Sequence, residues 1–228
     1  MINTTEKAKQ IKGEVLEKSI THNQGHVAPS LSCLDILTCL YYHSAAPDDT
    51  IILSKGHGCY ALYAILADKG YIPKEKWENF ELPGCLEGYG SLGHGLPVGA
   101  GIAYANQRLG NDRHVWVIVG DGELQEGSNW EALSFIFHHE LQNITIIVDC
   151  NGLQAMDKIN NILFQMLPGR FLGWGFESEE CDAHDHSQLK ETLDDKPPVI
   201  LAKSIKGKGI SYMENQPEWH FKVPYDEC

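Results

Sequence analysis

The sequence predicts an α/β protein with a doubly wound parallel sheet flanked by helices. Apolar runs at 115–119, 144–148 and 199–203 are short and rich in β-branched residues, as expected for buried parallel strands. Segments with helical periodicity separate these runs, and this alternation is typical of a doubly wound sheet. With 228 residues, 43% of them hydrophobic, the chain can bury a full core, so we expect residues 1–228 to form a single domain.

The first third of the chain is predicted to be mainly helical. Thr4 or Thr5 is expected to cap a helix whose apolar residues at 8, 11, 15, 16 and 20 follow the helical period. Pro29 suits the first turn of a second helix over 30–42, which is apolar around most of its circumference and therefore central. A short strand at 51–53 and a loop at 54–58 lead to a helix over 59–69, and Pro73 opens a short helix ending near residue 80.

The remaining elements alternate between strands and helices. Residues 83–99 are rich in Gly and Pro, a composition typical of a binding loop, and a helix of small residues follows over 99–109. The strand at 115–119, a helix over 127–141 and the strand at 144–148 then form one βαβ unit. His184-Asp185-His186 is interpreted as a solvated turn, and the Lys-Gly-Lys-Gly segment at 206–209 as a loop beneath the site.

Composition narrows the possible partners and compartments. A net charge of −13 disfavours nucleic acid and anionic membrane surfaces, so we expect neither as a partner. The seven cysteines are scattered without a Cys-x-x-Cys pair, which argues against a disulfide framework and a structural zinc site. No apolar stretch reaches the roughly 18 residues that a membrane span needs. We therefore expect a cytoplasmic protein.

Asp121 and Asn151 are the residues that point most directly to chemistry. Asp121 lies in Gly120-Asp121-Gly122 directly after one predicted strand, and Asn151 follows the next strand, thirty residues further on. Both should emerge at the carboxyl edge of the sheet, where open α/β sheets bind ligands. A carboxylate, an amide oxygen and a nearby carbonyl suit Mg²⁺ bound to a diphosphate, and Gly120 and Gly122 would let backbone N–H groups approach phosphate oxygens.

Six blocks, in order along nearly the whole chain, resemble the amino-terminal, diphosphate-binding half of transketolase. They are Gly-His at 25–26, Lys-Gly-His at 55–57, Gly-Ser-Leu-Gly-His-Gly at 90–95, Gly-Asp-Gly-Glu-Leu-Gln-Glu-Gly at 120–127, Asp-Cys-Asn-Gly-Leu-Gln at 149–154, and Lys-Gly-Lys-Gly at 206–209 through Pro-Glu-Trp-His at 217–220. The resemblance implies the thiamine diphosphate-binding fold and a thiamine diphosphate enzyme with Mg²⁺, for which Ca²⁺ or Mn²⁺ are expected substitutes. It places the metal on Asp121, Asn151 and the backbone carbonyl of Leu153.

The same resemblance implies roles around the cofactor. His57 and His220 would lie against the diphosphate and the reacting carbons, and His26 would face the substrate carbonyl. Gly90 and Leu92 would contact the aminopyrimidine ring. Histidines with near-neutral pKa values suit the proton movements at hydroxyl and carbonyl oxygens.

The implied activity is transfer of a two-carbon ketol unit from a ketose or ketose phosphate donor to an aldehyde. In this family the activating Glu comes from a following pyrimidine-binding domain, and this chain stops at Cys228. We therefore expect a partner, a carboxyl-terminal transketolase-like subunit that carries this domain and its Glu, in an α2β2 heterotetramer acting on small sugars. Glu126 resembles the acidic residue that links paired active sites across the dimer interface.

Two departures from the family pattern concern the substrate. The usual Gly-His-Pro histidine is absent from 77–82, and Phe221 follows His220 where a small Gly is common. A specialised sugar or a smaller ketol donor is therefore a plausible alternative to the pentose-pathway donor. Two further alternatives are a thiamine diphosphate-dependent E1-type or acyloin-forming subunit, and a non-catalytic scaffold that needs no cofactor.

Overall fold

A five-stranded, all-parallel sheet forms the centre of the molecule, in the order β1-β2-β3-β5-β4. The computed structural model describes residues 2–79, 91–163 and 166–225. The strands are β1 (Thr50–Leu53), β2 (Val115–Gly120), β3 (Ile144–Cys150), β4 (Ser178–Asp182) and β5 (Val199–Lys203). The predicted fold class is confirmed.

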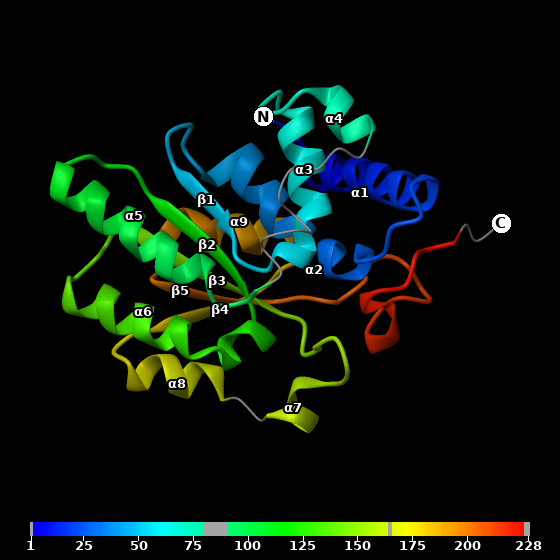
Figure 1. Cartoon of the computed structure of the whole chain (residues 1–228). Coiled ribbons are helices and arrows are strands. Elements are labelled where there is room, and N and C mark those ends of the chain that lie inside the picture. Colours follow the sequence, from blue (N-terminus) through cyan, green and yellow to red (C-terminus); the bar gives the residue numbers. More distant parts are fainter. Residues whose placement is uncertain (1, 80–90, 164–165, 226–228) are drawn as a thin grey trace.

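The helices cover both faces of this sheet, as Figure 1 shows. On one face, α1 (Thr4–Thr21), α2 (Val27–Cys39), α3 (Cys59–Asp68) and α9 (His186–Asp195) share a buried apolar cluster with the sheet. On the other face, α5 (Gly95–Leu109), α6 (Gly127–His138) and α8 (Leu167–Gly173) share a second cluster. The short helix α4 (Lys74–Glu78) adds Trp77 to the first cluster, whereas no residue of α7 (Ile159–Ile162) belongs to either cluster.

The side chains of β2 explain why both faces are covered. Val115, Val117 and Val119 belong to the cluster beneath α5 and α6, whereas Trp116 and Ile118 belong to the cluster beneath α1 and α2. Because successive residues of a strand point to opposite faces, an uninterrupted apolar run requires a helical layer on each side.

Several helix boundaries differ from the predictions. Asn3, and not Thr4 or Thr5, caps α1, since its side chain accepts hydrogen bonds from the backbone N–H groups of Thr5 and Glu6. The second helix begins at Val27, three residues before the predicted start, and a π-helical turn, Leu40–Ser44, follows Cys39. The fifth helix begins at Gly95 inside the expected binding loop.

The segment before β5 was not predicted in full, because β4 and α9 were missed. The interpretation of His184-Asp185-His186 as a solvated turn is wrong for both histidines. His184 Nδ1 lies 2.7 Å and His186 Nε2 2.9 Å from the two carboxylate oxygens of Asp35 on α2. Asp185 caps α9, so this tripeptide joins the start of a helix to the core.

None of the helices in the described ranges is long and apolar enough to cross a membrane. Five cysteines within these ranges are free thiols, and four of them are buried.

Candidate active site

A cavity of about 390 Å³ opens at the carboxyl edge of β2 and β3. The two strands are in register to their ends, where Gly120 pairs with Asp149, so the loops that follow them diverge from one point. Residues from both loops, from the start of α2 and from the carboxyl-terminal segment line the cavity: His26, Pro29, Lys55, His57, Leu92, Gly120, Asp121, Gly122, Glu123, Asn151, Leu153, Gln154, Ala155, Lys206, His220 and Phe221. Its size is in the range of small-molecule sites.

Asp121 is a buried carboxylate held by backbone N–H groups. Its Oδ1 accepts a hydrogen bond from Gly122 (2.9 Å) and its Oδ2 accepts one from Gly152 (2.6 Å), so the side chain ties the two loops together. Burial, aided by the charge of Asp149, raises the pKa of Asp121 to about 7. A carboxylate that burial destabilises to this extent gains most from a bound cation.

Asn151 and Leu153 provide further oxygen atoms on the same wall. Asn151 Oδ1 accepts a hydrogen bond from the Leu153 N–H at 3.0 Å. This bond fixes both the orientation of the Asn151 side-chain amide and the conformation of the turn. Backbone hydrogen bonds from Gln154 to Asp157 and from Ile159 to Gly152, both 2.9 Å, close the rest of the loop. The oxygens available here are of the hard type that Mg²⁺ prefers, so the residues present fit a magnesium-bridged diphosphate.

A fully buried ion pair between Lys55 and Asp149 lies beneath these loops. The Lys55 and Asp149 side chains are 1% and 0% exposed. Lys55 Nζ also donates to the Pro29 carbonyl (3.0 Å), and the hydroxyl groups of Ser32 and Ser204 donate to Asp149. Burial alone would raise the pKa of Asp149, but the Lys55 charge and these hydrogen bonds together lower it. Asp149 is therefore an ionised anchor at the end of β3.

Three histidines that line the cavity form a cluster. The His57 and His220 rings lie 5.1 Å apart and are tilted by 31°, and the His26 ring meets His220 edge-on at 5.6 Å. Burial, followed by the charges of nearby lysines, lowers the pKa values of all three. The three imidazoles are therefore neutral at pH 7, and each can donate through one ring nitrogen and accept through the other.

Lys206 connects this cluster to the loop after β3. Its Nζ lies 2.8 Å from His220 Nδ1 and donates to the Gln154 carbonyl at 3.0 Å. Both side chains are buried, with exposures of 2% for Lys206 and 8% for His220. Burial, followed by the charge of Lys55, lowers the pKa of Lys206 to about 8.

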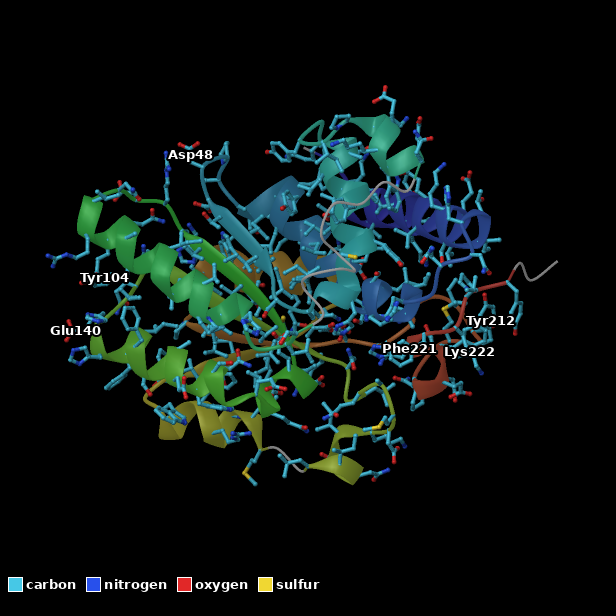
Figure 2. The ribbon with its side chains drawn as sticks, in the orientation of Figure 1. Asp48, Tyr104, Glu140, Tyr212, Phe221 and Lys222 are labelled. Carbon is cyan, nitrogen blue, oxygen red and sulfur yellow. The ribbon has the colours of Figure 1, made fainter. Side chains whose placement is uncertain are left out.

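Phe221 lies at the mouth of the cavity. Its side chain is 61% exposed, and its ring meets the His26 ring edge-on at 5.1 Å. A side chain at Gly25 would collide with the backbone carbonyl of Phe221, so Gly25 permits this close approach of the two segments. Figure 2 labels Phe221 and Lys222 on the segment just before the carboxyl terminus. His26 itself has a positive φ of 63°, which is unusual for a residue other than Gly. This conformation sets the direction in which the backbone enters α2.

Glu123 joins the glycine-rich loop to the Gly-Asp-Gly turn. Its buried carboxylate accepts hydrogen bonds from the backbone N–H groups of Gly93 (2.8 Å) and Gly120 (3.0 Å), and from the Ser54 hydroxyl. Leu92 is held at the cavity wall through its neighbour Gly93.

Most of the predicted site residues meet in this cavity. It is lined by His26, His57, Leu92, Gly120, Asp121, Gly122, Asn151, Leu153 and His220. Glu126 is not among its lining residues, because it occupies the cap position before α6. Gly90 lies outside the described residues. Lys55, Glu123, Asp149 and Lys206 were not predicted as site residues, although all four fall within the motif blocks, which is the signal that could have identified them.

Comparisons with known proteins show the family to which the chain is similar. Residues 3–170 match the family model described as 1-deoxy-D-xylulose-5-phosphate synthase. The chain is 37% identical to an apulose-4-phosphate transketolase subunit of Actinobacillus succinogenes, over 96% of this chain and 90% of that protein. It is 31% identical to 6-deoxy-6-sulfo-D-fructose transketolase subunit SqwG of a Clostridium species, over 94% and 89%. The crystal structure of transketolase from Campylobacter jejuni superimposes with a TM-score of 0.86 at 26% identity, over 96% of this chain and 40% of that one.

Proposed function

The chain belongs to the transketolase family, and from this premise we propose that it is the diphosphate-binding subunit of a heteromeric transketolase. The observation that carries the proposal is the convergence of Asp121, Asn151 and Leu153 with Lys206 and a histidine cluster in one cavity. Hard oxygen ligands together with cationic and N–H donors in one cavity suit a metal-bridged diphosphate.

The family depends on thiamine diphosphate, and we propose specific residues for holding it. Asp121, Asn151 and the Leu153 carbonyl would bind Mg²⁺, while the backbone N–H groups near Gly120 and Gly122 would face phosphate oxygens. Leu92 would contact the aminopyrimidine ring. When bound, thiamine diphosphate supplies the electron sink for breaking a carbon–carbon bond next to a ketone.

The protein's own contribution is to position the substrate and to direct protons. His26 enters the cavity at the start of α2, next to His220 and Phe221, and we assign it to the substrate oxygen. His57 is partly buried and neutral, with Lys55 two residues before it, which suits donation to an anionic oxygen. Neutral imidazoles can hold or move a proton at these positions without adding a buried charge.

We further propose that a second protein chain completes the site. This chain covers about two fifths of the solved transketolase, and three relatives that it matches along most of their length are themselves named as subunits. The partner would carry the pyrimidine-binding domain and its activating Glu, in an α2β2 assembly. Glu126, which lies at the start of α6 outside the cavity lining, would link the two copies of this chain.

The substrate class we propose is a ketose that carries an anionic terminal group, with an aldehyde as acceptor. The support is that two relatives are named for different ketoses, one with a phosphate and one with a sulfonate. Phe221 contacts the His26 ring at the mouth of the cavity. Because a small Gly is common at this position in the family, the larger Phe221 side chain supports a specialised donor.

The assignment is tested with Asp121→Ala. In the presence of the partner protein, we expect this variant to lose Mg²⁺-dependent binding of thiamine diphosphate, measured by isothermal titration calorimetry, together with ketol transfer. Asp112→Ala is the matched control, because Asp112 is an exposed carboxylate in the segment before β2. Retention of cofactor binding by Asp121→Ala would refute the proposal, and a wild-type complex that gives no cofactor-dependent heat would favour the scaffold alternative.

A second candidate is an acyloin-forming enzyme, which the synthase description of the family model supports. It shares the cofactor site but uses a different donor. Release of CO₂ from a 2-oxo acid donor, without activity toward ketoses, would identify it.

A further inference from the structure

We propose that Lys206 is a positioning residue that locks His220 in the tautomer with its proton on Nε2, so that His220 acts as a hydrogen-bond donor in the cavity and not as a base. This inference rests on the proposed function for its role in catalysis. The tautomer itself can be tested on the chain alone.

The direction of the hydrogen bond between Lys206 and His220 follows from which of their atoms can donate and which can accept. Lys206 Nζ lies 2.8 Å from His220 Nδ1 and 3.0 Å from the Gln154 carbonyl oxygen. A lysine ammonium has three donors and no acceptor, so Nδ1 must accept and cannot carry a proton. The proton of the neutral ring is then on Nε2, and a fixed partner on one ring nitrogen defines the state of the other.

The surroundings of the pair keep the charge on lysine. Burial, followed by the charges of Lys206, His26 and Lys55, lowers the pKa of His220 to about 3. The pKa of Lys206 is lowered only to about 8, because Asp121 and Asp149 partly offset burial and the charge of Lys55. At pH 7 the pair is therefore a lysine cation beside a neutral imidazole.

The other ring nitrogen of His220 is directed to the ligand. His220 is 8% exposed and lines the cavity, and no hydrogen bond to its Nε2 is present within residues 2–79, 91–163 and 166–225. An N–H donor on Nε2 is therefore available to an acceptor atom of a molecule bound in the cavity. The neighbouring ring of His57, tilted by 31° at 5.1 Å, and the edge of His26 hold the imidazole plane in place. The expected acceptor is an anionic or carbonyl oxygen of the bound molecules.

The tautomer is measured by NMR of the full chain labelled with ¹⁵N-histidine, without cofactor or partner, at pH 7. The His220 signals are assigned by their loss in His220→Gln. We expect Nδ1 of the wild-type protein to show the shift of an unprotonated nitrogen and Nε2 that of a protonated one. Lys206→Met should give a mixture of tautomers, and Lys206→Arg, which keeps a cationic donor, should restore the single form. A proton on Nδ1 in the wild type, or an unchanged single tautomer in Lys206→Met, would overturn the proposal.

The donor role is measured in the complex with the partner protein. Gln can donate an N–H from a similar position but cannot accept a proton as a base. We expect His220→Ala to lose about 100-fold in kcat/KM, as for removal of one preorganised donor, and His220→Gln to recover at least about tenfold of that loss. Equal losses in the two variants, with thiamine diphosphate binding intact, would refute the donor role. Absence of cofactor binding in the wild-type complex would instead refute the proposed function and leave the NMR result standing.

Discussion

Replacement of Asp149 by Ala should destabilise the protein strongly, because it leaves the Lys55 ammonium buried without a counter-charge. The two side chains are 0% and 1% exposed, so solvent cannot screen the loss. Removing one member of such a pair costs about 3–5 kcal/mol. The hydroxyl groups of Ser32 and Ser204 also lose their acceptor, which adds up to about 1 kcal/mol in total because each hydroxyl can rotate toward another acceptor. We therefore expect a loss of about 3–6 kcal/mol.

Urea denaturation followed by tryptophan fluorescence measures this loss as a change in the free energy of unfolding. In a thermal melt, a loss of this size corresponds to a decrease in Tm of roughly 6–24 °C for a chain of this length. Glu180→Ala is the matched control, since Glu180 pairs with Lys203 at 3.1 Å on the same sheet but both side chains are about half exposed. Its cost should stay below about 1 kcal/mol.

The double variant Lys55→Met with Asp149→Leu separates charge burial from general packing. Replacing both charges by apolar side chains of similar size should recover much of the stability lost in Asp149→Ala. If Asp149→Ala cost no more than Glu180→Ala, or if the double variant were less stable than Asp149→Ala, the argument from an unpaired buried charge would be wrong.

Three further perturbations test the scaffold of the site. Glu123→Ala leaves the N–H groups of Gly93 and Gly120 without their carboxylate acceptor, so we expect a loss of about 2–3 kcal/mol in urea denaturation and weaker cofactor binding; an unchanged urea midpoint would contradict this. Gly25→Ala places a methyl group against the backbone carbonyl of Phe221, and we expect a loss of about 1–3 kcal/mol with a change in Trp219 fluorescence, whereas wild-type stability would show that the contact is not tight. Burial would raise the pKa of Asp35, but hydrogen bonds from His184 and His186 and their charges lower it overall. Its contribution to stability should therefore be complete above the unfolded pKa of about 3.9 and disappear as the pH falls through the folded value. Asp35→Asn should show a weaker dependence of stability on pH in this acid range, and an identical dependence in both proteins would refute the link.

The sequence alone determined the central strands and the place of the site. The runs that became β2, β3 and β5 are apolar on both faces, and this pattern depends only on neighbouring residues. Placing Asp121 and Asn151 together needed one additional rule, that parallel strands joined by a helix end at the same edge of a sheet. Strand β4 was missed because it has mostly exposed polar residues at the sheet edge, with Cys181 as its buried position, and so lacks an apolar run.

Only the tertiary structure decided which charges are paired and which are buried. Lys55 and Asp149 are 94 residues apart, and Asp35 meets His184 and His186 across about 150 residues. Lys206 and His220 are closer in sequence, yet their hydrogen bond depends on a tail that packs against Gly25. Periodicity reports which face of an element is apolar, because that property is local. Ionisation and tautomeric state depend on burial and on the groups that the fold brings within hydrogen-bonding distance.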